Sequence, residues 1–126
     1  MTDLHEIIEY VKSNLSEKRF NHIKGVAQTA KDLAEFYGEN PDFAEMAGYL
    51  HDIAKEISLE EMNQLAKDID LDESIRTSKA MMHAIAGACL ANNLFDIPEE
   101  VYWACYYHTT GRENMTTLEK IIFLSD

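Results

Sequence analysis

Apolar side chains recur with helical spacing along the whole chain. Near the N-terminus this spacing places four apolar residues on one helix face: Leu4, Ile7, Val11 and Leu15. Asp3 precedes this segment and is a candidate N-cap. No segment alternates apolar and polar residues for long enough to indicate a strand, and no internal repeat is visible. The pattern therefore predicts an all-α fold.

Capping residues divide this pattern into separate helices. Ser16 begins a long helix that Gly38 ends, and Pro41 occupies the first position of the next helix. Capping boxes begin at Ser58 and Thr116. We expect helices over residues 4–15, 16–38, 41–52, 58–67, 78–95, 96–107 and 116–126, with an irregular charged connection over residues 68–77. These segments predict a bundle of about six to seven helices.

The composition indicates one domain with a sizeable core, since 46% of its 126 residues are hydrophobic. No run of eighteen apolar residues is present, and the acidic start lacks the features of a secretory signal. Cys89 and Cys105 each lie in an apolar stretch without a neighbouring cysteine partner. We therefore expect reduced thiols in a cytoplasmic protein, with no membrane contact.

The net charge of −12 argues against a nucleic-acid surface, because phosphate backbones require clustered lysine and arginine. This net charge does not exclude a small anionic substrate. Bound divalent cations would reverse the field inside one pocket while the remaining surface stayed acidic. A phosphorylated small molecule is thus compatible with this chain if metals are present.

Six candidate metal ligands lie in otherwise apolar, helical segments. They are His22, His51, Asp52, His83, His108 and Asp126. Imidazoles and carboxylates that converge from several helices are typical ligands of a divalent metal. The remaining histidine, His5, lies among acids on the first helix, and we assign it no role. The set predicts hydrolysis with bound metal.

Small residues lie one helical turn from three of these histidines. Gly25 follows His22, Gly48 precedes His51, and an Ala-Gly pair follows His83. Side chains at this spacing share a helix face. The small neighbours leave room either for an ion or for close approach of another helix, and both explanations stay open.

Asp52 is suited to the centre of a metal site, because its two oxygens could bridge two ions. Adjacent residues of a helix point roughly 100° apart. His51 and Asp52 therefore share one ion only if their side chains lean together or the helix loosens there.

The order H…HD…D, here His22, His51–Asp52 and Asp126, resembles the HD-domain metal phosphohydrolases. The extra His83 and His108 resemble the branch that holds two metals. Four segments are similar to the bacterial YqeK-like HD proteins, which are symmetrical diadenosine tetraphosphate hydrolases: RFNH over 19–22, LHDIAK over 50–55, YHTTGR over 107–112 and LEKIIFLSD over 118–126. We expect one HD domain over 1–126, truncated at its C-terminus relative to that family.

The resemblance implies a dinuclear site. His22, His51, Asp52 and Asp126 would hold one ion, and Asp52 would bridge to a second ion held by His83 and His108. Iron is the first candidate, with manganese, cobalt, nickel and zinc as alternatives. A metal-activated hydroxide would cleave diadenosine tetraphosphate to two ADP. Asp52 and Lys55 would be the catalytic residues.

Six residues are candidate ligands for the nucleotide or its phosphates: Arg19, Lys55, Thr109, Thr110, Gly111 and Arg112. Lys55 follows the His-Asp pair by one turn, and Arg19 shares a helix face with His22. The alternatives are a solvated lysine, an arginine paired with a glutamate, and an ordinary turn after a helix.

Three other functions stay open. They are another HD phosphohydrolase, such as a nucleotidase or a cyclic-dinucleotide phosphodiesterase, a non-catalytic nucleotide-binding sensor, and a structural bundle with buried histidines. The expected partner is a small-molecule nucleotide, and a homodimer is possible. The chain stops within an apolar helical run, so we expect the native protein to continue beyond Asp126.

Overall fold

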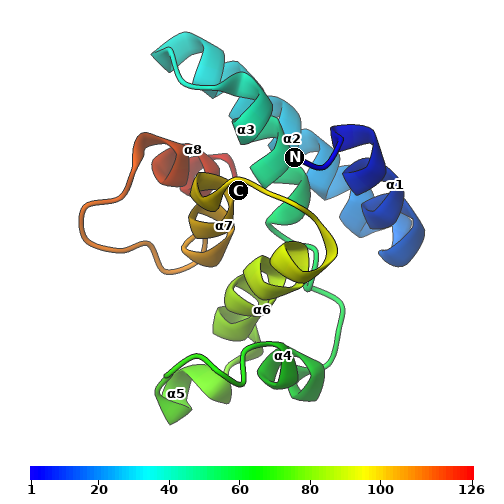
Figure 1. Ribbon diagram of the computed structural model, residues 1–126, viewed down its shortest axis with the longest axis vertical. Helices are drawn as coiled ribbons and strands as arrows, with labels where there is room; N and C mark the ends of the chain where they lie inside the picture. Colours follow the sequence, from blue (N-terminus) through cyan, green and yellow to red (C-terminus); the bar gives the residue numbers. More distant parts are fainter.

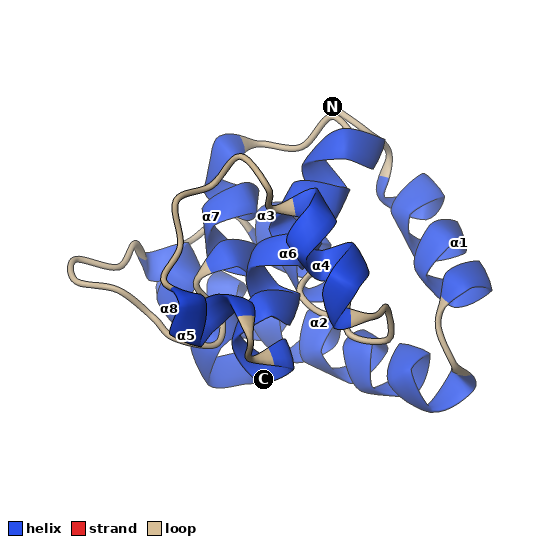
Figure 2. Ribbon diagram, turned by 90° about the horizontal axis from the view of Figure 1, so that it is seen from below, coloured by secondary structure: helices blue, strands red, loops and turns tan.

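The computed structural model describes residues 1–126 as eight α-helices without a strand (Figures 1 and 2). The helices are α1 (Leu4–Asn14), α2 (Glu17–Tyr37), α3 (Pro41–Leu50), α4 (Leu59–Leu65), α5 (Glu73–Arg76), α6 (Lys79–Leu94), α7 (Glu99–Tyr106) and α8 (Thr117–Ser125). The all-α prediction is confirmed. The number of helices is one or two higher than expected.

The additional helix is α5, a single turn within the connection that was expected to be irregular. Arg76 donates to the backbone carbonyls of Ala66 and Ile69, and it also donates to the side chain of Asn63 at 3.1 Å. These contacts tie the turn to the end of α4. The helix therefore depends on tertiary contacts that the local pattern does not contain.

Most helix starts are set by the capping residues that the sequence indicates. A side-chain oxygen accepts a backbone N–H of the first turn at Asp3, Ser16, Asn40, Ser58, Ser78 and Thr116. Gly38 ends α2 with φ of 73°, in the left-handed region. The exceptions are α5 and α7, which have no side-chain cap. Helix α7 begins at Glu99 after Pro98, slightly later than expected.

Helices α2 and α3 pack closely because Gly48 faces Ala27. A Cβ added at Gly48 would lie 2.5 Å from the Cα of Ala27. Close helix packing therefore explains the glycine beside His51. The glycine beside His22 is different, since a Cβ on Gly25 would meet nothing within 4 Å.

Two hydrophobic clusters form the core. The larger contains 20 buried residues and joins α1, α2, α3, α7 and α8 with the later half of α6. The smaller contains 6 buried residues and joins α4, the earlier half of α6 and the turn after α3. Figure 1 shows α4 and α5 grouped beyond α6, away from α1 and α2. Helix α6 thus connects both clusters.

Both cysteines are free thiols, as expected. Cys105 is fully buried, whereas Cys89 is only half-buried. Burial raises the pKa of each thiol above its ordinary value. No helix has both the length and the apolar character that a membrane crossing requires.

Candidate metal centre

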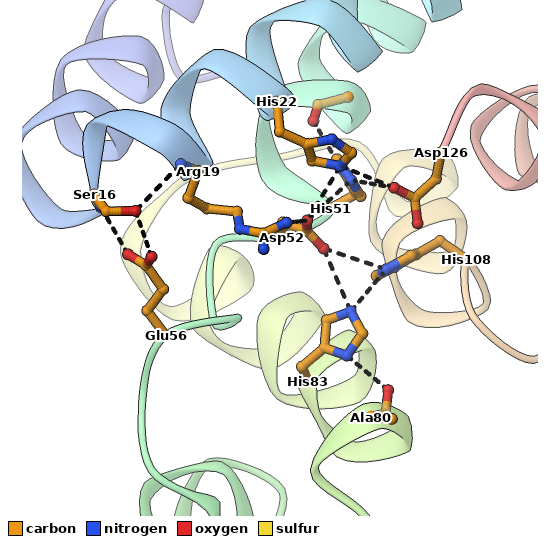
Figure 3. A network of polar contacts seen from close by, with 11 residues as sticks. Ser16, Arg19, His22, His51, Asp52, Glu56, Ala80, His83, His108 and Asp126 are labelled. Carbon is orange, nitrogen blue, oxygen red and sulfur yellow. Dashed lines mark hydrogen bonds and ion pairs between the residues drawn. The ribbon is translucent and has the colours of Figure 1, made fainter.

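The six residues that the sequence singles out come together in one site (Figure 3). His22 lies within α2 and His83 within α6. The others follow the C-terminal ends of α3, α7 and α8: His51 with Asp52, His108, and Asp126. Five helices therefore position the cluster. His5 is exposed and lies outside it.

The His51–Asp52 pair lies where α3 loosens into a series of turns. Helix α3 ends at Leu50, and His51 is its C-cap. The Nε2 atom of His51 lies 3.5 Å from Oδ2 of Asp52, although adjacent helical side chains diverge. The turn brings both groups to the same point, as the sequence required for a shared ion.

The first group of ligand atoms consists of His22, His51, Asp52 and Asp126, and these atoms lie within 4.8 Å of one another. Oδ1 of Asp126 is 3.1 Å from Nε2 of His22 and 3.3 Å from Nε2 of His51. Oδ2 of Asp52 is 3.6 Å from Nε2 of His22. Two imidazoles and two carboxylates thus surround one small volume, which is a suitable donor set for a divalent cation.

The second group consists of Asp52, His83 and His108. Oδ1 of Asp52 lies 3.3 Å from Nε2 of His83 and 3.6 Å from Nε2 of His108. The two Nε2 atoms are 3.1 Å apart. The oxygens of Asp52 therefore face different groups, which is the arrangement that a carboxylate bridging two ions requires.

Three of the four histidines make the same contact with the backbone. Each Nδ1 lies 2.6–2.7 Å from the backbone carbonyl three residues earlier, in the pairs His51 with Gly48, His83 with Ala80, and His108 with Cys105. A carbonyl only accepts, so each Nδ1 carries the hydrogen and donates it. This contact leaves Nε2 as the atom that faces the cluster, and such contacts orient metal-binding imidazoles.

Cations fit this donor set. When His83 and His108 are neutral, their Nε2 lone pairs face each other at 3.1 Å in a buried environment. Lone pairs in this position repel unless a proton or a cation lies beside both of them. The Oδ1 of Asp52 adds negative charge at the same point. A metal ion satisfies all three atoms at once.

The pKa values of the cluster reflect burial and the contacts between its carboxylates and its imidazoles. Burial would raise the pKa of Asp52, but hydrogen bonds with His108 and His83 outweigh it and hold this pKa far below its ordinary value. Hydrogen bonding with His51 lowers the pKa of Asp126 to about 2. Burial lowers the pKa of His108. For His51 the opposing hydrogen bond with Asp126 and the nearby carboxylates prevail over burial, and its pKa is raised.

Arg19 is the cationic side chain nearest to the cluster. Its Nη1 donates to Oδ2 of Asp52 at 3.0 Å, on the same face of α2 as His22. Its Nε is buried and has no hydrogen-bond partner. The sequence left open a pairing of Arg19 with a glutamate, whereas the structure pairs it with the central aspartate (Figure 3).

Lys55 lies beside the second group. It is half-buried and lines a cavity of about 300 Å³ together with Lys79, Ala80 and His83. Sequence reasoning did not select Lys79. A signal for it was available, since Lys79 lies four residues before His83 and therefore on the same helix face.

The loop after α7 contains the other predicted phosphate ligands. Thr109 and Thr110 are exposed in the turn that follows His108, and Gly111 has φ of 65°. This confirms a loop leaving the cluster. Phosphate binding by Thr109, Thr110 and Gly111 stays a prediction.

Arg112 forms no hydrogen bond or ion pair with the cluster and has other partners. Its Nε and Nη2 each donate at 2.8 Å to Glu119, which is 1% exposed. Its guanidinium also covers the rings of Trp103, at 5.4 Å, and Tyr107, at 4.5 Å. Arg112 thus fastens the loop after His108 to α8, the helix that leads to Asp126. Phosphate binding by Arg112 stays a prediction that would compete with these contacts.

The sequence model of the HD domain matches residues 19–126. The match contains all six residues of the cluster and most of the chain. The chain therefore belongs to the HD-domain family.

Three curated relatives carry the name "Bis(5'-nucleosyl)-tetraphosphatase, symmetrical". The protein from Halalkalibacterium halodurans is 40% identical over 94% of this chain, that from Staphylococcus aureus 39% over 91%, and that from Bacillus subtilis 37% over 96%. The alignments cover 65%, 60% and 66% of these relatives. The chain thus spans less than two thirds of their length.

A crystal structure from Clostridium acetobutylicum shares the fold with a TM-score of 0.92 and 36% sequence identity. The comparison covers 99% of this chain and 68% of that protein. That protein is described as a predicted HD superfamily hydrolase involved in NAD metabolism.

Proposed function

We propose that this chain is a metal-dependent phosphohydrolase that cleaves diadenosine tetraphosphate symmetrically to two ADP. The observation that carries the proposal is the carboxylate of Asp52, whose two oxygens face two separate groups of imidazole donors. The names of the three curated relatives support this substrate. The HD phosphohydrolase resemblance supports the reaction class.

The proposed cofactor is a pair of divalent cations, with iron as the first candidate. His22, His51, Asp52 and Asp126 would hold one of them, and Asp52, His83 and His108 would hold the other. Nitrogen and oxygen donors of this kind also accept manganese, cobalt, nickel and zinc. When bound, the pair would acidify a water and stabilise negative charge on phosphate oxygens.

The residues of the chain keep the ligand atoms ready for this chemistry. Hydrogen bonds with His108 and His83 outweigh burial and hold Asp52 ionised, since its pKa is strongly lowered. His108 is held neutral, because burial lowers its pKa. Each of these groups would therefore present lone pairs rather than protons to a cation near neutral pH.

Arg19 and Lys55 would neutralise the phosphate chain. Arg19 already contacts the cluster through Oδ2 of Asp52, the oxygen that faces the first group. Lys55 borders the cavity beside His83. Together with bound cations they would give one positive site on a chain of net charge −12, which would attract a polyphosphate to this site.

The test is an analysis of products. Metal-loaded protein and diadenosine tetraphosphate should yield ADP as the only nucleotide product, resolved by anion-exchange chromatography. In water enriched in oxygen-18, half of the ADP should carry one heavy oxygen, because a single water adds across the central bridge. Release of AMP and ATP would contradict symmetrical cleavage. Tight binding of ADP without turnover would instead identify a sensor.

A cytoplasmic location and a homodimer stay predictions. Apolar side chains are exposed at the end of α2, where Phe36 is 80% exposed, and at the end of α8, where Leu124 is 75% exposed. Light scattering after size-exclusion chromatography would determine the oligomeric state.

A further inference from the structure

One cavity differs from the others in charge. The structure contains four cavities, and three of them have at least one glutamate in their walls and neither lysine nor arginine. The fourth, with a volume of about 300 Å³, is lined by Lys55, Lys79, Ala80 and His83. It is also the only cavity with a residue of the metal centre in its wall. We call it the lysine cavity.

The two lysines of this cavity are available to an anion. Neither has a carboxylate within 4.0 Å, although the chain contains 23 acidic residues and only 11 lysines and arginines. Lys79 is exposed at the first position of α6, and Lys55 is half-buried in the turn after Asp52. Two unpaired ammonium groups at one cavity of an acidic protein favour a ligand with several negative charges.

We infer that the lysine cavity holds the phosphates that extend beyond the cleaved bond on the His83 side, and that Lys79 is a specificity-determining residue for phosphate-chain length. This inference rests on the proposed function and names a residue that the sequence did not select. The bond that is cleaved would lie at the metal centre. The chain of phosphates would then pass His83 and reach Lys55 before Lys79.

The geometry of α6 supports this path. Lys79 and His83 are four residues apart, so both side chains lie over the same face of the helix. The Nε2 of His83 lies near Asp52 and His108, and His83 also lines the cavity. The cavity and the second group of ligand atoms therefore share His83.

The size of the cavity limits what it can hold. Pockets for whole small molecules range from roughly 300 to 1,000 Å³. The lysine cavity is at the lower limit, so it suits a short phosphate segment better than a complete dinucleotide. Lysine also suits this task, because its ammonium is a compact charge on a flexible stem that can follow a phosphate chain.

The test compares Lys79→Gln with Lys67→Gln. Lys67 is exposed after α4, forms no ion pair and lines no cavity, so its substitution removes the same charge elsewhere. The probe is inorganic tripolyphosphate, and the readout is its Kd from isothermal titration calorimetry on metal-loaded protein. K79Q should weaken binding about fivefold, as expected for one exposed ion pair, and K67Q should leave it unchanged.

Two further measurements separate phosphate binding by Lys79 from a general effect of the substitution on the protein. K79R should restore the affinity for tripolyphosphate, and K79Q should raise KM for diadenosine tetraphosphate while kcat stays close to that of the unaltered protein. Equal tripolyphosphate affinity in K79Q and K67Q would overturn the inference. If the unaltered protein does not cleave diadenosine tetraphosphate but K79Q still weakens tripolyphosphate binding, the proposed function fails and the anion site stands.

Discussion

The two oxygens of the Asp52 carboxylate have different neighbours. Arg19, His22 and His51 lie near Oδ2, whereas His83 and His108 lie near Oδ1. An imidazole in this position would offer one lone pair at a time. A carboxylate offers both oxygens, so the identity of this single residue decides whether two ions can be held together.

Substitution of Asp52 with asparagine should therefore empty the site. Asparagine keeps the size of the side chain but replaces one oxygen with an NH2 group that cannot bind a cation. We expect D52N to lose at least about 100-fold in metal affinity, more than changes next to metal ligands usually cause. Metal content after purification, measured by plasma mass spectrometry, checks this. D32N, an exposed change on α2, is the control. Stoichiometric metal in D52N would refute the bridging role.

The lowered pKa values of Asp52 and Asp126 predict acid sensitivity of the metal-free protein. An unfolded aspartate has a pKa of about 3.9, whereas Asp126 in the folded protein has a pKa of about 2. As pH falls below about 4, the unfolded chain binds protons first, so the free energy of unfolding decreases toward pH 2. Thermal unfolding at pH 5, 4 and 3 measures this effect. The thermal stability of D126N should decrease less as the pH falls. A decrease equal to that of the unaltered protein would count against the pairing of Asp126 with His51.

At the scale of elements, the α2–α3 contact sets the position of His22 relative to His51. The contact is close because Gly48 has no side chain where Ala27 approaches. Since His51 also uses the carbonyl of Gly48, the packing of α3 against α2 and the orientation of the imidazole are set at the same residue.

Two glycine substitutions test this contact. G48A would place a methyl group 2.5 Å from the backbone of Ala27, so the helices must separate, and we expect a loss of about 1–3 kcal/mol in the free energy of unfolding. G25A is the matched control on α2, where the new methyl meets nothing within 4 Å. It should gain up to about 1 kcal/mol, because alanine favours helices over glycine. Urea denaturation measures the free energy of unfolding of both variants. Equal changes in G48A and G25A would refute the packing argument.

Local and tertiary signals explain which elements the sequence could predict. The caps at Ser16, Asn40 and Thr116 act within their own helices, so the sequence alone locates these helix starts. Helix α5 depends on Arg76 reaching carbonyls at the end of α4, and no local pattern contains that contact. The same limit applies to the pairing of Arg112 with Glu119, since Glu119 is visible in the sequence only as part of a capping box.

The convergence of the six candidate ligands could be foreseen because polar residues in apolar helices need partners. Their division into two groups was expected only from the resemblance to the two-metal HD proteins, because the residue pattern by itself does not contain it. That division depends on the turn after α3, which directs Oδ2 of Asp52 toward His51 and Oδ1 toward His83. Lys79 was missed although its spacing from His83 was visible, because the sequence does not show the cavity that both residues line.

At the scale of the whole molecule, the candidate metal centre combines residues from elements of both hydrophobic clusters. His22 and Asp126 belong to helices of the larger cluster, and His83 belongs to the part of α6 that faces the smaller one. Bound cations would therefore connect parts of the chain that are otherwise joined mainly through α6.

Chelation should consequently lower the thermal stability of the protein. A ligand present at 100 times its Kd stabilises the folded state by about 2.7 kcal/mol, provided that the unfolded chain does not bind it. We expect Tm to fall on treatment with a chelator and to return when metal is added back. D52N should show no response to either treatment. Scanning calorimetry measures this, and an equal response in D52N would contradict binding at this site.

The main-chain partners of the three imidazoles have a consequence for how freely the sequence can vary around the site. Because the peptide bond supplies each acceptor, no exchange of side chain at Ala80 or Cys105 can delete it. The tautomer of His83 and His108 is set by a backbone carbonyl rather than by the side chain of another residue. Neighbouring positions can therefore drift over evolutionary time, while the protonation pattern of the imidazoles stays the same as long as the helices persist.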